Sequence, residues 1–171
     1  EKVERCLARL ADDLDSAGRE LILTLPGRMD AVRAELATHP AAVTHRDFHL
    51  DNVLFEPTGR PVILDWALAG WGAVAADVGR VLVECIGTRD LPGGYAAAHD
   101  SVLDAYRGEV RRLGAGPCPR PELARGVGLA LHVTLAGAVT WAGAAKRPAP
   151  GSREVALARN LVLNCVAALL A

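Results

Sequence analysis

The sequence predicts a mainly helical α+β fold. Apolar residues recur at intervals of three or four over most of the chain, as they do at Val3, Cys6, Leu7 and Leu10 near its start, and this period is typical of amphipathic helices. The pattern changes only in the first half, where two short apolar runs flank a segment with two prolines and a glycine. Such a segment predicts a β-hairpin. Because an isolated hairpin is marginally stable, we expect it to lie against helices.

Periodicity and turn residues define the elements in chain order. The expected helices cover residues 2–15, 29–36, 77–86, 95–113, 122–145 and 152–170. Between the first two, Pro26 and Gly27 are expected to interrupt the chain, and the second should stop near His39 because a residue before proline disfavours helix. Residues 41–44 should be extended. The hairpin strands are expected at 53–55 and 62–64, and a flexible loop at 69–72.

Helix termini give further local signals. Asp77 and Ser152 are plausible N-caps, because short polar side chains accept hydrogen bonds from the first free backbone N–H groups of a helix. Pro121 suits the first turn of the helix expected after the Gly- and Pro-rich residues 114–121. Residues 126–145 contain no charged side chain and are long enough to span a bilayer. Their glycines and threonines make them only weakly apolar, so we expect a helix buried inside a helical body.

Bulk properties narrow the function. The 171 residues suggest one domain or one lobe, and 51% apolar residues suffice for a core. A formal charge of -1 implies no strong attraction to nucleic acid or to an anionic membrane, and neither is expected as a partner. The four cysteines (Cys6, Cys85, Cys118 and Cys165) form no C-x-x-C pair. Reduced thiols in a cytoplasmic protein are therefore expected.

Polar residues suited to phosphoryl transfer surround the expected hairpin. Asp47 and Asn52 lie five residues apart ahead of it, and Asp65 follows its second apolar run. This order predicts one free carboxylate beside an amide oxygen and a second carboxylate. Transfer from a magnesium nucleotide needs these groups, namely a base for the attacking hydroxyl and hard oxygen ligands for Mg²⁺.

The segment HRDFHLDN resembles the kinase catalytic loop H-R-D-x-x-x-x-N, and Asp65 in LDW resembles the metal-binding Asp that follows it. The whole pattern is most similar to the aminoglycoside phosphotransferase and choline kinase group of small-molecule kinases. The resemblance implies that Asp47 is the catalytic base, that Asn52 and Asp65 bind Mg²⁺, and that His45 braces the loop. It also implies ATP, or another nucleoside triphosphate, as the phosphate donor.

Other positions fit this family less closely. Asp77 resembles the Asp that opens the following helix and has a structural role there, and His49 is a possible phosphate or substrate contact. Arg46 stands where glycine is common, Ala67 where an acidic residue is common, and Ala73 where the usual Gly-Asp-Pro has its Asp. These departures affect the expected class of acceptor more than the expected metal binding, because the residues at the base position and at both metal positions are those of the family.

The resemblance also implies an N-terminal nucleotide lobe. No glycine-rich phosphate loop and no V-A-I-K-like strand precede the motif. We therefore expect residues 1–171 to form the C-terminal lobe of a protein-kinase-like fold, with its β-hairpin at the catalytic loop. Alone, this lobe is expected to be inactive, because the phosphates would lack their lysine and glycine cradle.

The expected function is ATP-dependent phosphorylation of a hydroxyl on a small molecule, which is either an antibiotic such as an aminoglycoside or a choline-like or sugar metabolite. Two alternatives stay open. One is a non-catalytic kinase-like interaction module. The other is a metallohydrolase that uses the alternating His45, Asp47 and His49, which would share one face of a strand.

Acidic residues after the motif admit two interpretations. A rim that binds an amine substrate would consist of Glu84, Asp90, Asp100 and Asp104. Such carboxylates more commonly lie on solvent-exposed faces of helices.

Overall fold

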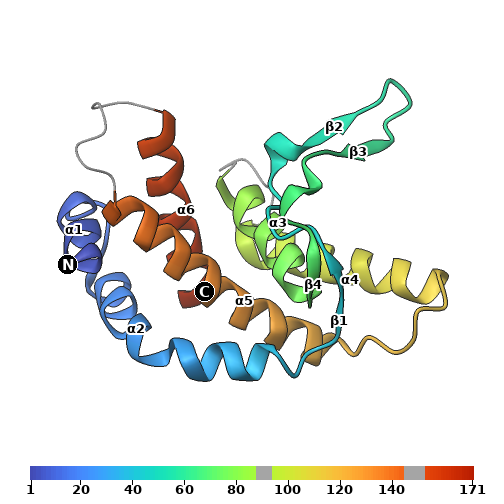
Figure 1. Cartoon of the computed structure of the whole chain (residues 1–171), viewed down its shortest axis with the longest axis horizontal. Coiled ribbons are helices and arrows are strands. Elements are labelled where there is room, and N and C mark those ends of the chain that lie inside the picture. The colour runs from blue at the N-terminus through green and yellow to red at the C-terminus, as the bar shows by residue number, and fades with distance from the viewer. Residues whose placement is uncertain (88–93, 145–152) are drawn as a thin grey trace.

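The computed structural model describes residues 1–87, 94–144 and 153–171. As expected, the described chain is mainly helical with small antiparallel sheets. Its α-helices are α1 (Lys2–Arg9), α2 (Ser16–Leu36), α3 (Ala75–Gly87), α4 (Gly94–Arg112), α5 (Arg120–Ala144) and α6 (Arg153–Leu170). Its strands are β1 (Ala41–Thr44), β2 (Val53–Phe55), β3 (Pro61–Ile63) and β4 (Gly70–Ala73). Figure 1 shows β1 and β4 leading from the helical body to the outlying β2–β3 hairpin.

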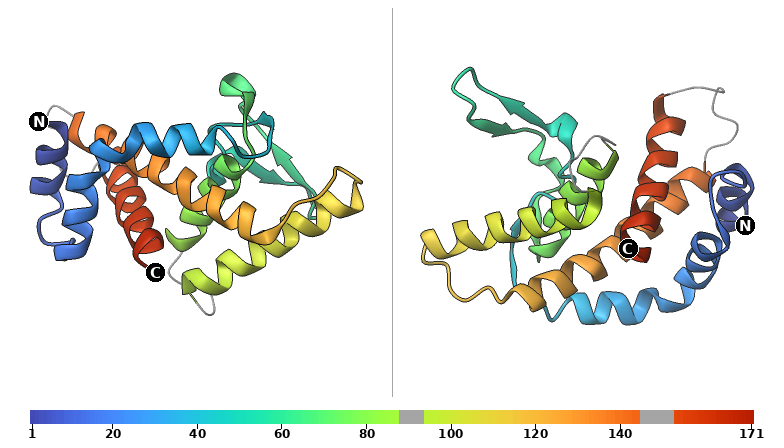
Figure 2. Two further views of the ribbon diagram at one scale, coloured as in Figure 1. Left: turned by 90° about the horizontal axis from the view of Figure 1, so that it is seen from below. Right: turned by 180° about the vertical axis from the view of Figure 1, so that it is seen from behind.

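Helix α5 is the element against which the other helices pack. Pro121 and Glu122 lie in its first turn, where a missing N–H is harmless and a negative charge is favourable. It contacts α1, α2, α3, α4 and α6, and Figure 2 shows it running through the middle of the helices. By length and composition alone α5 is apolar enough to cross a membrane. Its contacts with five other helices account for that composition, because they bury a stripe of its side chains that includes Val127, Leu131 and Leu135, as expected for a core helix.

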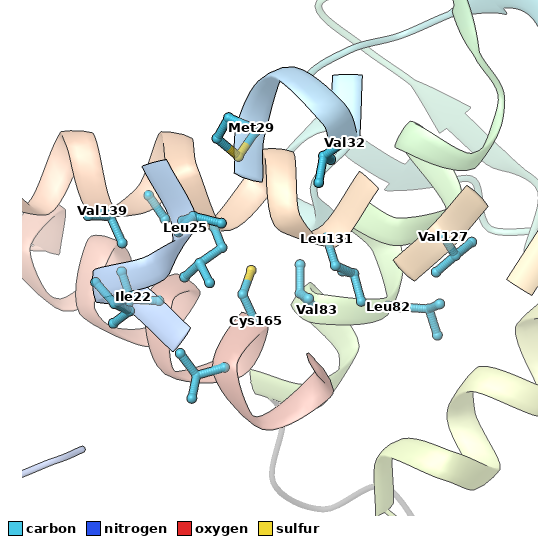
Figure 3. Close-up of a cluster of buried hydrophobic side chains, with 14 of the residues drawn as sticks. Ile22, Leu25, Met29, Val32, Leu82, Val83, Val127, Leu131, Val139 and Cys165 are labelled. Atoms are coloured by element: carbon cyan, nitrogen blue, oxygen red, sulfur yellow. The ribbon is translucent and has the colours of Figure 1, made fainter. Parts of the chain in front are cut away.

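The core forms where α2, α3, α5 and α6 converge, as Figure 3 shows. Ile22, Leu82, Leu131 and Cys165 are all at most 1% exposed, and each large aliphatic side chain buried in this way contributes about 1.5–3 kcal/mol. Burial raises the pKa of the Cys165 thiol to about 12, so this side chain is neutral and packs as an apolar group. Cys6, Cys118 and Cys165 are free thiols in the described part of the chain, and the side chain of Cys85 lies outside it.

The expected interruption at Pro26 is wrong. Helix α2 continues through Pro26 and bends along its length (Figure 1). Proline in a helix interior costs roughly 3 kcal/mol, but the same helix buries Ile22, Leu25 and Met29 on one side, which outweighs that cost.

The first helix is also shorter than expected, because Asp15 caps α2 by accepting a hydrogen bond from the Gly18 N–H.

The expected flexible loop at residues 69–72 is also wrong. Residues 70–73 form β4, which pairs antiparallel with β1, so that Thr44 lies opposite Gly70 and Ala42 opposite Gly72. The Thr44 hydroxyl donates a hydrogen bond to the Gly70 carbonyl at 3.0 Å. A Cβ at Gly70 would lie 2.8 Å from the guanidinium carbon of Arg46, so a larger residue there would have to displace the Arg46 side chain from the place where it crosses the strand.

The hairpin is present at the expected place, but it is not packed against helices. Strands β2 and β3 pair with Val53 opposite Ile63 and Phe55 opposite Pro61, and Gly59 supplies the positive φ of 81° that the turn needs. The hairpin projects from the helical body in both figures. Phe55 is accordingly 69% exposed. Hydrogen bonds at its base, rather than side-chain burial, hold it to the rest of the chain.

Candidate functional site

The loop after β1 makes a left-handed turn that α3 holds in place. Arg46 has a φ of 67°, which is unfavourable for a residue with a side chain. Both oxygens of the Asp77 carboxylate compensate for this, because they accept hydrogen bonds from the His45 N–H at 2.6 Å and the Arg46 N–H at 3.0 Å. The Arg46 guanidinium donates a further bond to the Trp71 carbonyl at 2.6 Å. A residue other than glycine is therefore accommodated at position 46.

The expectation that Asp77 caps its own helix is wrong. Helix α3 begins at Ala75, so Asp77 lies within its first turn. Its carboxylate instead ties the helix to the loop that carries Asp47. Asp77 thus contacts the loop through two backbone N–H groups rather than the start of its own helix.

His45 connects this loop to the segment that follows the hairpin. The ring is buried, at 3% exposure. Its Nε2 donates to the Leu64 carbonyl at 2.7 Å, and its Nδ1 accepts from the Asp47 N–H at 3.3 Å; a carbonyl only accepts, so the proton must be on Nε2. The ring also packs against Trp66, with centroids 4.9 Å apart. His45 therefore positions both Asp47 and the residues around Asp65.

The metallohydrolase interpretation does not fit this arrangement. Both ring nitrogens of His45 are used in hydrogen bonds to the backbone, so His45 has no lone pair left for a metal. Across residues 1–87, 94–144 and 153–171, no group of three His, Cys, Asp or Glu side chains is placed to hold a metal ion.

Asp47, His49 and Asn52 lie together on the loop. The Asn52 amide nitrogen donates to the Asp47 carbonyl at 3.0 Å and lies 3.1 Å from His49 Nε2. The same His49 nitrogen is 3.5 Å from the Asp47 carboxylate. These contacts direct the amide nitrogen of Asn52 into the loop and leave its Oδ1 without a hydrogen-bond partner among the described residues.

Asp65 directly follows Leu64, which is hydrogen-bonded to Asn52 at the base of the hairpin. The Leu64 N–H donates to the Asn52 carbonyl at 2.9 Å, so Asp65 is one residue beyond this bond. Asp65 has a left-handed backbone, with φ 56° and ψ 63°. Such backbone strain often accompanies functional positions. Its carboxylate is exposed, and it makes no hydrogen bond to any other residue in the described part of the chain.

A cavity of about 430 Å³ opens next to the loop. Asp47 and His49 form one side of it, and α3 contributes Arg80 and Glu84. Helices α5 and α6 form an apolar wall that includes Trp141, Leu157 and Leu161. Of these helix residues, the sequence indicates only Glu84 as a candidate for substrate binding. Trp141, Leu157 and Leu161 lie far from the motif and carry no local pattern that distinguishes them from core residues.

The acidic rim is not formed. Asp100 and Asp104 lie on α4, where both pair with Arg120, and neither lines the cavity. Glu84 does line it, but it pairs with Arg80 at 3.2 Å. Asp90 lies outside the described residues.

Comparison with known proteins identifies the family. The sequence profile of the phosphotransferase enzyme family matches residues 2–113, which is most of the chain and includes the whole loop, hairpin and α3. The chain belongs to the phosphotransferase enzyme family. This confirms the family that the motif predicted. No curated protein matches the chain.

A solved structure shares the fold of this phosphotransferase family member. It is a protein from Ralstonia eutropha JMP134 described as a putative aminoglycoside phosphotransferase. The superposition covers 99% of the present chain and 54% of that protein, with a TM-score of 0.52 and 19% sequence identity. The chain therefore spans about half the length of this structural relative.

Removal of the Asp77 carboxylate tests how far this phosphotransferase site depends on α3. Asp77→Ala leaves two loop N–H groups without their acceptors, so we expect the free energy of unfolding to fall by about 2–3 kcal/mol and kcat to fall about tenfold or more. Asp77→Asn keeps one acceptor and should be intermediate in both. Urea unfolding and steady-state kinetics of the intact protein provide the measurements. A loss of stability with unchanged kcat would show that Asp77 does not position the loop for catalysis.

Proposed function

We propose that this chain is the catalytic-loop and acceptor-binding half of a kinase that transfers the terminal phosphate of Mg-ATP to a hydroxyl of a small molecule. One observation carries the proposal. Asp47 lines a cavity large enough for a small molecule, while its loop is hydrogen-bonded to the segments that hold Asn52 and Asp65. A base and a pair of hard oxygen ligands are what phosphoryl transfer requires of this half of a kinase.

In this proposal Asp47 accepts or orients the proton of the acceptor hydroxyl. Its carboxylate is half-buried, and among the described residues no cationic side chain bonds to it other than His49 when that ring is protonated, so it is available as a hydrogen-bond acceptor. The backbone around it is fixed from both sides by His45 and Asp77. Such fixation places the hydroxyl oxygen for attack without a further conformational cost.

The donor set around Asn52 and Asp65 fits Mg²⁺. Mg²⁺ is usually held in such sites by one or two protein oxygens together with phosphate and water oxygens. The Asp65 carboxylate has no competing partner among the residues that the structure describes, and Asn52 keeps Oδ1 free because its nitrogen is engaged in the loop. When bound, Mg²⁺ would neutralise charge on the phosphates during transfer.

His49 has a defined place in this arrangement. Its Nε2 accepts from the Asn52 amide, so in the neutral ring the proton lies on Nδ1. Nδ1 would then donate to an oxygen of the phosphate or of the acceptor. His49 is therefore proposed as a contact of the transferred group rather than as the base.

The nucleotide-binding half would come from another part of the intact protein. The structural relative is about twice as long as the region it shares with this chain, which agrees with such an arrangement. We place the enzyme in the cytoplasm, where Mg-ATP is abundant and free thiols such as Cys118 stay reduced.

The test is phosphate transfer by the intact protein. We expect a panel of hydroxyl-bearing acceptors with Mg-ATP to give a monophosphorylated product by mass spectrometry and an equal amount of ADP. Binding of Mg-ATP without transfer to any acceptor would favour a non-catalytic interaction module. Absence of both binding and transfer would reject the kinase assignment.

A further inference from the structure

The acceptor cavity has two unlike sides. The catalytic loop brings Asp47 and His49 to one of them, whereas α5 and α6 face them with Trp141, Leu157 and Leu161. Trp141 is 44% exposed and Leu157 is 41% exposed. Large apolar side chains that stay in contact with water at the edge of a cavity are typical of surfaces that bind an apolar partner group.

Among the described residues, two of the three carboxylates that line the cavity are paired with arginines. Glu84 pairs with Arg80 at 3.2 Å, and Asp51 pairs with Arg153 at 2.6 Å. Asp47 is the remaining carboxylate in the cavity wall, and the proposed mechanism uses it to bind the hydroxyl. An ammonium group on an acceptor would therefore have to displace an arginine before it gained a partner.

One arginine adds positive charge to the same walls. Arg46 and Arg80 both line the cavity, but the charge of Arg80 is balanced by Glu84. The Arg46 guanidinium bonds to the Trp71 carbonyl, which is neutral, so its charge is not balanced by a carboxylate of the described residues. A cation placed beside Arg46 would be repelled, and the repulsion is stronger in a partly enclosed cavity than in bulk water.

We propose that the acceptor is a hydroxyl-bearing molecule with an apolar, uncharged ring body, and that polycationic acceptors are disfavoured. This inference rests on the proposed function and narrows its substrate class. The hydroxyl meets Asp47, and the ring body lies against Trp141 and the leucines of α6. The cavity volume of about 430 Å³ is within the range of pockets that enclose such molecules.

Matched acceptors test the charge preference. The intact enzyme is assayed with pairs of hydroxylated ring compounds that differ in one substituent, an alkyl group in one and a primary amine in the other, and with a polycationic aminocyclitol. We expect kcat/KM to be at least about tenfold higher for the alkyl compound. Higher kcat/KM for the amine or for the aminocyclitol overturns the inference but leaves the proposed function standing. Phosphorylation of none of them, when Mg-ATP binds, rejects both.

Variants of the apolar wall test the binding mode. Trp141→Ala is expected to raise KM for the alkyl acceptor about tenfold with a smaller change in kcat. Leu113→Ala is the matched control, because Leu113 is 67% exposed and lies outside the cavity. Thermal unfolding checks that both variants fold. Unchanged KM in a folded Trp141→Ala enzyme contradicts the proposed contact.

A charge variant gives an independent readout. Arg80→Gln leaves the Glu84 carboxylate without its cation, so the ratio of kcat/KM values should shift about tenfold toward the amine-bearing acceptor. Arg80→Gln combined with Glu84→Gln should remove the shift. The absence of a shift in a folded single variant would show that the ion pair does not set the preference.

Discussion

Asp47→Asn in the intact enzyme is expected to lower kcat about 10³-fold, because a positioned general base contributes on the order of 10²–10⁴. The substitution keeps the size of the side chain and removes only its charge and basicity. The backbone carbonyl of Asp47, which accepts from Asn52, is unaffected, so the loop should keep its shape. The affinity for Mg-ATP should therefore stay close to that of the unmodified enzyme.

Glu56→Gln is the matched control for this experiment. It also neutralises a carboxylate isosterically, but Glu56 lies at the turn of the hairpin and pairs with Arg60 at 2.8 Å, away from the cavity. Its kcat should not change. Turnover by Asp47→Asn equal to that of Glu56→Gln would remove Asp47 from the mechanism, whereas a parallel loss of Mg-ATP binding would indicate that the substitution damaged the loop.

The parts of the fold that were predictable have local causes. The hairpin follows from two apolar runs around Pro57, Gly59 and Pro61, because these turn residues act through their own backbone angles. The long helices follow from apolar periodicity, and α5 was correctly placed in the core because its glycines and threonines made a membrane helix less suitable. The family followed from the joint spacing of Asp47, Asn52 and Asp65, which is far more specific than any one of these residues.

The parts that were missed depend on contacts between distant residues. The glycines of β4 predict a loop, and these residues form a strand only because β1 supplies their hydrogen-bond partners. Pro26 predicts a break in the helix, but the burial of neighbouring side chains on α2 outweighs the cost of the proline. The sequence predicts that Asp77 caps its own helix, whereas the N–H groups that bond to its carboxylate lie more than 30 residues earlier in the chain. No local pattern in the sequence contains this information.

The same long-range contacts explain why the site has its shape. The Asp77 carboxylate on α3 accepts a hydrogen bond from the start of the catalytic loop. The ring of His45 bonds the loop to the Leu64 carbonyl after β3. The Asn52 amide bonds to the Asp47 carbonyl within the loop. The three connections come from different elements, so the loop does not rely on the packing of the exposed hairpin. The positions of Asp47 and Asp65 are thus coupled through His45, whose ring bonds both to the Asp47 N–H and to the Leu64 carbonyl.

Asp65→Asn is expected to abolish most of the Mg²⁺ dependence of nucleotide binding. A carboxylate that holds the metal accounts for several kcal/mol of charge stabilisation, so kcat/KM for ATP should fall by about 10²–10³-fold. Asparagine is the appropriate replacement because the backbone of Asp65 is left-handed; asparagine adopts that conformation readily, whereas alanine would add strain.

The measurement is a titration of ATP binding to the intact enzyme at a series of Mg²⁺ concentrations. In the unmodified enzyme the affinity for ATP should rise with Mg²⁺, and in Asp65→Asn it should stay nearly constant. Asp65→Gly provides the backbone control, because glycine also accepts a positive φ and removes the ligand entirely, so it should behave like Asp65→Asn. If both variants follow the titration curve of the unmodified enzyme, Asp65 does not bind the metal, and the hydrogen bond between Leu64 and Asn52 at the base of the hairpin has a purely structural purpose.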